Sequence, residues 1–266
     1  MNDESKEQNL INEKLDRVLE SLLQHDKKIA KLQNDIDIML KKIQNYYSEL
    51  NFADLFHDTI NNSAWLKDKS FSLHGWAANY SFIYMLYRIL NNAKPGHILE
   101  MGMGQTSRLT SQYIAYCNSG ATLDIIENDF GWISTYQPQL AQSERIKVHL
   151  CDLDIFVHEN TECRKYKKLN EVIGGKKYDL IIIDGPYGGN QTMPRSNILE
   201  IIKNGNLADD FIIVFDDTER QGEQNTVKET LNILKEQNIS FIMFSREGIK
   251  TQTYITSLTK SFVQYL

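Results

Sequence analysis

The sequence predicts an α/β protein in which a doubly wound, seven-stranded sheet ends in an antiparallel hairpin and follows a long N-terminal helix. Three observations predict this fold. Apolar residues recur at steps of four and three through residues 11–50, which is typical of a coiled-coil helix. From residue 97 onward, short β-rich runs alternate with helical stretches, as in a parallel sheet that helices cover. Two further strand-like runs near the end of the chain are joined only by residues 246–249.

Composition and charge limit the classes of function. Of the 266 residues, 41% are hydrophobic and 24% charged, which is ordinary for a globular α/β domain with an appendage. The net charge is −6 and no Lys/Arg run is interleaved with aromatic residues, so nucleic acid is disfavoured as a partner. The 3 cysteines lack CxxC spacing, so we expect reduced thiols. Since the N-terminus is polar and no apolar run approaches roughly 18 residues, we expect a cytoplasmic protein without a transmembrane segment.

Residues 1–52 are expected to form a coiled-coil helix that makes the chain a homo-oligomer. Neither Pro nor Gly interrupts the pattern before Gly75. With Leu15 at heptad position a, the a positions are Leu or Ile and the d positions are mixed, which favours a parallel dimer and leaves a trimer open. If fully helical, residues 11–50 would be about 60 Å long, and their apolar stripe needs a partner to be buried. The seam consists of Ile11, Leu15, Val18, Leu22, His25, Ile29, Leu32, Ile36, Met39, Ile43, Tyr46 and Leu50.

Residues 53–96 are expected to hold a linker, marked by Asn61-Asn62-Ser63, and one covering helix. The apolar and aromatic run HGWAANYSFIYMLYRIL, residues 74–90, predicts a helix that packs on the following sheet. Such a helix commonly covers a ligand pocket. His74 is therefore a candidate for contact with a substrate, with a structural hydrogen bond as the alternative.

Residues 97–266 are expected to form the α/β domain. Two of its runs, 178–185 and 211–217, are almost continuously apolar, which is typical of strands buried on both faces. The last two runs must form an antiparallel hairpin, because a parallel crossover needs about a dozen residues or more. The predicted strands are 97–102, 122–128, 146–152, 178–185, 211–217, 239–245 and 250–258.

The turn after the first predicted strand reads EMGMGQTS, and three kinds of ligand loop use glycine in almost this way. A P-loop is excluded because no Gly-Lys-Ser/Thr follows, and a dinucleotide loop lacks its third Gly because Ser107 takes that position. The remaining ExGxG pattern resembles motif I of class I S-adenosylmethionine-dependent methyltransferases, whose Rossmann-like, seven-stranded sheet also ends in a hairpin. The resemblance implies that the glycines admit the amino-acid part of the methyl donor and that Glu100 organises its amine side. The implied donor-binding residues of this turn are Glu100, Gly102, Gly104, Gln105, Thr106 and Ser107.

Acidic residues also follow the second and third predicted strands. Glu127 could accept two hydrogen bonds from ribose hydroxyls, a geometry shared by NAD and S-adenosylmethionine sites. Asp152 lies where the methyltransferase pattern places an acceptor for the adenine amine, with a helix N-cap as the alternative.

Three carboxylates follow the fourth and fifth predicted strands, namely Asp184, Asp216 and Asp217. Because ligands bind at the carboxyl ends of strands in open α/β sheets, we expect these groups to converge at a site. Together they could hold a divalent metal ion through oxygen ligands. Alternatively, one carboxylate is a general base, or Asp216 or Asp217 only caps the helix that begins near Glu223.

Over residues 97–234 the chain resembles a narrower group, the glucuronoxylan-type polysaccharide O-methyltransferases and their bacterial relatives. The motifs that carry this resemblance are MGMGQTS, ENDFGWI, YDLIIIDGPYG and FDDTERQGE, in matching order and spacing. The roles it implies are donor binding at Gly102, Gly104, Ser107 and Glu127, and catalysis or acceptor binding at Asp184, Asp217, Arg220 and Glu223. Tyr187 and Asp216 face the acceptor and depart from the pattern, which has a basic residue and a His there, so the particular sugar stays open. Arg195 and Arg220 are candidates for bidentate binding of an anionic acceptor such as a uronate or phosphate.

The sequence therefore predicts an S-adenosylmethionine-dependent O-methyltransferase that acts on a sugar, or a sugar-linked group, of a capsular or O-antigen type surface polysaccharide. Transfer is expected to be a direct displacement in which Asp184 or Asp217 activates the acceptor oxygen, directly or through a metal. Two alternatives stay open: a catalytically inactive scaffold in glycan assembly, and an NAD-dependent oxidoreductase. The latter would need a Tyr-Lys or Cys/His constellation, and none is well placed.

Overall fold

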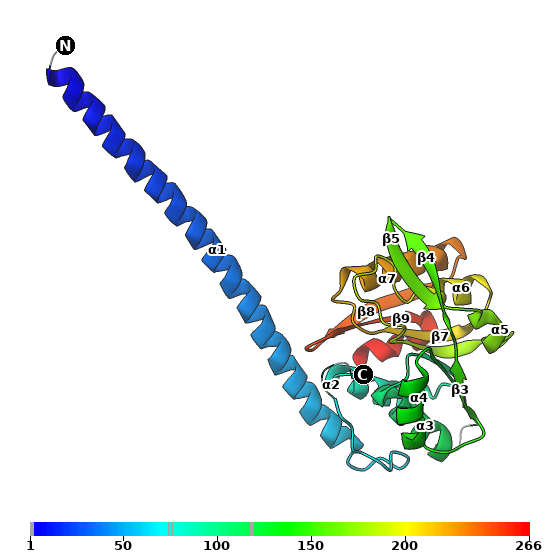
Figure 1. The fold of residues 1–266 in the computed structure, drawn as a ribbon. Helices are drawn as coiled ribbons and strands as arrows, with labels where there is room; N and C mark the ends of the chain where they lie inside the picture. The colour runs from blue at the N-terminus through cyan, green and yellow to red at the C-terminus, as the bar shows by residue number, and fades with distance from the viewer. Residues whose placement is uncertain (1–2, 74, 76, 118–119) are drawn as a thin grey trace. The chain divides into compact units, whose positions relative to one another are not determined.

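The computed structural model describes residues 3–73, 75, 77–117 and 120–266, and the chain divides into two compact units after Tyr47. Helix α1 (Asp3–Ile60) forms the first unit and continues into the second (Figure 1). It therefore runs past the predicted boundary at residue 52. In the second unit, Phe56 and Ile60 near its end are buried in the core of the α/β domain, which explains why the helix extends this far.

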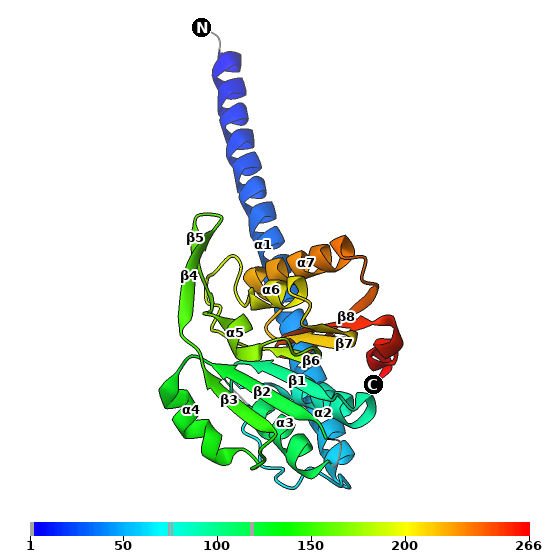
Figure 2. The ribbon, with the colours of Figure 1, turned by 90° about the vertical axis from the view of Figure 1, so that its right-hand side faces the viewer.

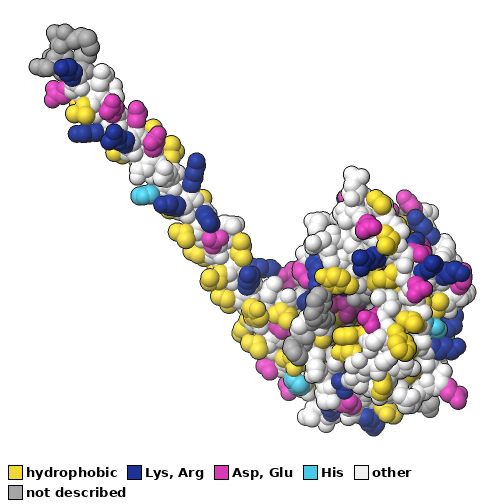
Figure 3. Space-filling model, in the orientation of Figure 1, with side chains coloured by type: hydrophobic (Ala, Val, Ile, Leu, Met, Phe, Trp, Pro, Cys, Tyr) yellow, Lys and Arg dark blue, Asp and Glu magenta, His cyan; other side chains and the backbone are white. Residues whose placement is uncertain are grey.

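The predicted seam of α1 is exposed along its length. Leu15, Leu22, Leu32 and Ile43 expose between 55% and 66% of their surface. In the space-filling view, apolar side chains lie along the described part of the helix (Figure 3). None of the described helices combines the length and the apolar character that a bilayer span requires.

The sheet has seven strands in the order β3-β2-β1-β6-β7-β9-β8. The first five in this order are parallel, whereas β9 runs antiparallel to both β7 and β8. The predicted parallel sheet with a closing antiparallel hairpin is thus confirmed. The strands are β1 (His97–Met101), β2 (Thr122–Glu127), β3 (Ile146–Leu150), β6 (Tyr178–Ile183), β7 (Leu207–Phe215), β8 (Phe241–Glu247) and β9 (Thr251–Ser257).

Helices cover both faces of this sheet, with α2 and α3 on one face and α6 and α7 on the other (Figure 2). The apolar runs of the strands divide between the two faces. In β6, Ile182 packs in the core under α2 and α3, while Ile181 and Ile183 pack in the core under α6 and α7. This alternation explains why β6 has no polar face. The helices of the domain are α2 (Tyr80–Ala93), α3 (Gln105–Tyr116), α4 (Phe130–Tyr136), η1 (Gln137–Gln139), α5 (Leu169–Ile173), α6 (Asn197–Lys203), α7 (Gln221–Glu236) and η2 (Leu258–Tyr265).

The covering helix α2 begins later than predicted, at Tyr80, and its end has a clear local cause. Lys94 adopts a left-handed conformation with φ 48°, and Pro95 follows it. A left-handed residue followed by proline is a common end of a helix. His74, the predicted first residue of this helix, and Trp76 lie outside the described residues.

A second hairpin, β4 (Leu153–His158) with β5 (Thr161–Tyr166), lies between β3 and α5 and was not predicted. Its two-residue turn has positive φ at both Glu159 (48°) and Asn160 (61°), as a type I′ turn requires. The sequence lacks the Asn-Gly or Asp-Gly pair that usually marks this turn, which explains the omission. Asn197 of α6 anchors the base of the hairpin, because its side chain bonds both the N–H (2.7 Å) and the carbonyl (3.0 Å) of Tyr166.

Candidate functional site

A cavity of about 660 Å³ lies at the carboxyl ends of β1, β2, β6 and β7. This edge is where open α/β sheets bind their ligands, and the volume lies within the range of cofactor sites. The lining residues are Gly75, Gly102, Met103, Glu127, Asn128, Asp129, Trp132, Tyr166, Asp184, Gly185, Pro186, Tyr187, Arg195, Asp217, Arg220 and Lys250.

The loop after β1 passes the loop after β6 at backbone contact distance. Gly102 has a φ of 94°, and a Cβ atom there would lie 2.8 Å from the backbone nitrogen of Gly185. Both the conformation and the close approach therefore require glycine at 102. Gly104 is different, since its backbone is extended (φ −177°) and a Cβ atom would meet nothing within 4 Å.

Glu100 points away from the cavity, into the domain. It is fully buried, and its carboxylate accepts hydrogen bonds from the hydroxyls of Thr106 (2.6 Å), Ser107 (2.8 Å) and Thr110 (2.8 Å). Burial raises the pKa of Glu100 to about 7, although these three hydroxyls lower it in part. The group braces β1 against α3. The side chain of Gln105 also turns away, accepting a bond from the Ser72 N–H at 3.2 Å.

Glu127, at the end of β2, does line the cavity. Its Oε2 accepts the N–H of Met103 at 3.0 Å, and its Oε1 accepts the N–H groups of Asn128 (2.6 Å) and Asp129 (2.9 Å). A carboxylate offers about four acceptor positions. Glu127 thus bonds the backbone of the loops after β1 and β2 and keeps one acceptor position for a ligand.

Trp132 joins the same wall. Asp129 caps α4 by accepting the Trp132 N–H at 2.9 Å, and the indole N–H of Trp132 donates to the carbonyl of Met103 at 2.5 Å. The Trp132 indole and the Glu127 carboxylate therefore both tie the loop after β2 to Met103 in the loop after β1. The sequence motif ENDFGWI contained this tryptophan, but its bond to the first loop depends on the fold.

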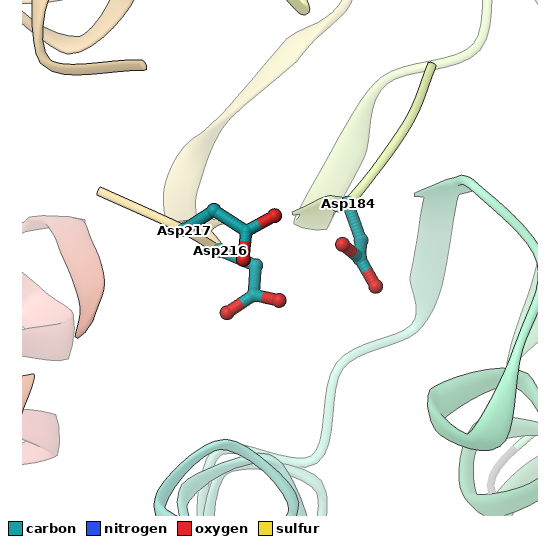
Figure 4. Close-up of side chains that lie close together, drawn as sticks. All are labelled: Asp184, Asp216 and Asp217. Atoms are coloured by element: carbon teal, nitrogen blue, oxygen red, sulfur yellow. The ribbon is translucent and has the colours of Figure 1, made fainter. Parts of the chain in front are cut away.

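The three aspartates predicted to converge do so. Asp184 follows β6, and Asp216 and Asp217 follow β7 (Figure 4), with one oxygen of each within 4.8 Å of the others. Asp184 and Asp217 line the cavity, whereas Asp216 is fully buried behind them. Asp217 has a φ of 59°, so the chain turns sharply at the strand end.

Three cations compensate these carboxylates, and one of them was missed in the sequence. The Arg195 guanidinium lies 2.7 Å from Asp217 Oδ2 and 3.5 Å from Asp184 Oδ1. Arg220 reaches the same Asp217 oxygen at 3.0 Å. The Lys250 ammonium lies 3.4 Å from both Asp216 Oδ2 and Asp217 Oδ1. Lys250 precedes β9, and no local sequence signal connects it with the aspartates.

Arg195 is 97% buried and lines the cavity from within the aspartate cluster. It also donates to the carbonyl of Asp216 at 2.8 Å. Its role here is to hold the ends of β6 and β7 together. Arg220 is more accessible, with about a third of its side chain exposed.

The environment separates the pKa values of two neighbouring carboxyls. Burial, and then the charge of Asp216, raise the pKa of Asp184 well above its usual value. Burial also acts on Asp217, but Arg195, Lys250 and Arg220 outweigh it and lower the pKa of that group. Asp217 is thus held ionised, whereas Asp184 tends to keep a proton. Pairs of carboxyls with separated pKa values are typical of acid–base sites.

The remaining predicted residues lie at different distances from this arrangement, with Glu223 3.7 Å from the Arg220 guanidinium. Asp152 is exposed and lies outside the described lining of the cavity. Glu223 is buried in the first turn of α7, and neither of its carboxylate oxygens has a hydrogen-bond partner among the described residues. Burial raises the pKa of Glu223. Tyr187 is 60% exposed and lines the cavity.

A second cavity of about 580 Å³ shares Tyr187 and Arg220 with the first. Side-chain amides dominate the rest of its wall, and no acidic residue lies among its described lining. The lining residues besides the shared pair are Gly189, Asn190, Gln191, Thr192, Gln221, Gly222 and Asn225. Amides and aromatic rings are suited to a ligand rich in hydroxyl groups.

In the observed conformation of its side chains, the aspartate cluster is poorly suited to bind a divalent cation. Mg²⁺ and Ca²⁺ need oxygen ligands at roughly 2.0–2.6 Å with space for further ligands. Lys250 instead stands between one oxygen of Asp216 and one of Asp217. The second oxygen of Asp216 accepts the Gln252 amide at 2.8 Å.

Comparison with known proteins concerns the fold alone. No protein-family model matches the sequence, and no curated protein matches it. Among solved structures, the O-methyltransferase TomG from Streptomyces achromogenes, solved with S-adenosylmethionine, aligns with a TM-score of 0.54. The alignment covers 81% of this chain and 98% of TomG at 13% identity. The chain has the class I methyltransferase fold. A Klebsiella pneumoniae protein described as a candidate O-methyltransferase aligns with a TM-score of 0.50 over 82% of this chain and 99% of that chain, at 12% identity.

Proposed function

We propose that the protein is an S-adenosylmethionine-dependent O-methyltransferase. One observation carries the proposal: a strand-end cavity brings together the glycine turn at Gly102, an acidic residue with a remaining acceptor position at Glu127, and the carboxyls of Asp184 and Asp217. The fold supports it, because TomG, which shares this fold, is an O-methyltransferase that binds S-adenosylmethionine. A dinucleotide is less well supported, since Ser107 replaces the third glycine of that motif.

The carboxyl groups can divide the proton chemistry. When bound, S-adenosylmethionine supplies an electrophilic methyl group on a positively charged sulfur. Asp184, whose pKa is raised, would lose its resting proton to solvent when positive charge enters the cavity beside it. Its carboxylate would then accept the proton of the acceptor hydroxyl as the acceptor oxygen bonds the methyl carbon, the bond from that carbon to sulfur breaks with its electron pair going to sulfur, and S-adenosylhomocysteine leaves. Asp217 stays ionised beside Arg195 and Arg220 and keeps the two strand ends in place.

The acceptor is proposed to be a sugar, or a sugar-linked group, of a surface polysaccharide. The amide-lined second cavity shares Tyr187 and Arg220 with the first cavity, so a hydroxyl-rich ligand bound in it would lie next to the donor. Arg220 could hold a uronate there. The motif resemblance to polysaccharide O-methyltransferases supports the same class of acceptor.

We further propose that α1 forms a parallel coiled-coil dimer. The exposed Leu and Ile residues of its seam support this, because an isolated helix cannot bury such a stripe. Sedimentation equilibrium should give a dimer mass for the wild type. Replacing both Ile29 and Ile36 by Asn should give the monomer mass, whereas the control K31Q, outside the seam, should remain dimeric. A monomeric wild type would contradict the proposal.

Titration with S-adenosylhomocysteine tests the donor site. Calorimetry should detect one site per chain, and E127Q should weaken it at least about tenfold, or 1.4 kcal/mol. The matched control E144Q removes an exposed carboxylate outside the described cavity lining and should bind like the wild type. Equal affinity of E127Q and wild type would contradict the assignment of Glu127.

Parallel titrations and a transfer assay separate the alternatives. Binding of NAD in place of S-adenosylhomocysteine would favour the oxidoreductase, and binding of neither would favour a scaffold. For the acceptor, transfer of a labelled methyl group to a uronate-containing oligosaccharide should exceed transfer to a neutral one. Y187A should lower this transfer and leave the affinity for S-adenosylhomocysteine within about twofold.

A further inference from the structure

Lys250 reaches the aspartate cluster through the topology of the last hairpin. Strand β9 runs antiparallel to β7, with Phe215 opposite Thr253. The start of β9 therefore lies at the end of β7, where Asp216 and Asp217 follow. The N–H of Thr218 donates to the carbonyl of Thr251 at 2.9 Å, which continues this contact beyond the strands.

The turn that carries Lys250 is fixed from two sides. Glu49, near the end of α1, accepts the N–H of Ile249 at 3.2 Å, and Gly248 donates its N–H to the carbonyl of Lys250 at 2.9 Å. The Lys250 ammonium also donates to the carbonyl of Ala77 at 3.0 Å. Only 12% of its side chain is exposed, so its position is set by the fold rather than by a mobile surface chain.

The ammonium lies beside two members of the acidic cluster, Asp216 and Asp217. It lies 3.4 Å from an oxygen of Asp216 and 3.4 Å from an oxygen of Asp217, and it faces the cavity. The other oxygens of these residues are bonded too, by Gln252 on Asp216 and by Arg195 on Asp217. A metal ion bound to the same carboxylate oxygens would lie next to the ammonium. Two cations so close together repel each other strongly in a buried site, so the metal ion would have to displace the ammonium.

We infer that Lys250 takes the position that a divalent cation would hold among Asp184, Asp216 and Asp217, and that the cluster needs no metal. The charge of these carboxylates is compensated by Lys250, Arg195 and Arg220. On the proposed function, on which this role rests, the ammonium faces the acceptor oxygen and stabilises negative charge that develops on it. Lys250 is then a catalytic residue that the hairpin supplies in place of a bound ion.

Manganese binding to the full-length protein tests this inference without an acceptor. Free Mn²⁺ is followed by electron paramagnetic resonance during titration of wild type, K250M, K250R and the control K177M, whose lysine is exposed. We expect no specific site in the wild type, K250R or K177M. In K250M one site should appear, at least about tenfold tighter than any binding to the wild type. Adding D216N to K250M should remove it.

Three results would overturn the inference: one tight Mn²⁺ site in the wild type, the same new site in K250R, or no site in folded K250M. Should K250M fail to fold, K250Q, which keeps a donor for the carbonyl of Ala77, replaces it. Titration of the same samples with S-adenosylhomocysteine separates the two proposals. A wild type that binds S-adenosylhomocysteine and also Mn²⁺ keeps the function and loses the inference. A wild type that binds neither, with a new Mn²⁺ site in K250M, loses the function and keeps the inference.

Discussion

Replacing Glu100 by glutamine should change how the stability of the protein depends on pH. Glutamine has the same shape, and its carbonyl can accept the hydroxyls of Thr106 and Ser107, which both donate to Glu100 Oε1. Its amide would then face Thr110, whose hydroxyl can turn to the backbone carbonyls of Thr106 (3.1 Å) or Ser107 (3.2 Å). E100Q therefore removes the ionisation and keeps the bonding.

The size of the effect follows from the pKa of Glu100. Burial raises it from 4.5 to about 7 on folding, so between these values the folded chain keeps a proton that the unfolded chain has released. The free energy of unfolding of the wild type therefore falls as pH rises through this window, by about 1.4 kcal/mol per pH unit. Between pH 5 and pH 8 the loss from this group is about 2.5 kcal/mol. E100Q does not show this loss, because glutamine does not ionise. All other titrating groups contribute equally to the pH dependence of both proteins.

Urea denaturation of wild type and E100Q at pH 5 and pH 8, at one protein concentration, measures this difference. Relative to the wild type, E100Q should gain about 2.5 kcal/mol between the two pH values. E171Q, which removes an exposed carboxylate, should follow the wild type. Parallel pH dependence of wild type and E100Q would refute the reasoning, because Glu100 would then not be a buried group that resists ionisation.

Three further predictions concern the folding of the site. G102A should lower the free energy of unfolding, measured by thermal denaturation, by about 2 kcal/mol or more, because its Cβ atom would lie 2.8 Å from the nitrogen of Gly185. The control G104A should lower it by about 1 kcal/mol or less. Equal losses in the two variants would contradict the close approach at Gly102. Burial raises the pKa of Asp124, but bonds from His149, Lys176 and Tyr178 outweigh it and lower that pKa to about 2, so D124N should lose about 2 kcal/mol at pH 7. This deficit should shrink as pH falls below about 4, and a constant deficit in denaturation experiments would contradict it. N197A should lose about 2–3 kcal/mol, measured by urea denaturation, because it leaves both backbone groups of Tyr166 unpaired; N190A, at an exposed position, serves as the control.

Local patterns in the sequence determined much of the domain. The continuous apolar run of β6 predicted a strand buried on both faces, and Ile182 and Ile183 do pack in opposite cores. The four residues between the last two strands predicted their antiparallel pairing, because a parallel crossover cannot be so short. Placing carboxylates directly after such strands was enough to predict that Asp184 and Asp217 meet. These features depend on chain direction and on burial, and both can be inferred from residues that are neighbours in the sequence.

Only the tertiary structure decided which groups surround those carboxylates. The acidic residue of the ExGxG pattern turned inward because three hydroxyls of α3 lie behind β1. Lys250 meets Asp216 across 34 residues because β9 inserts between β7 and β8, and that strand order leaves no local signal. Arg195 enters the cluster through a loop with positive φ at that residue. Sequence alone determined that carboxylates follow the strand ends. Long-range packing determined which cations lie beside these carboxylates and shift their pKa values.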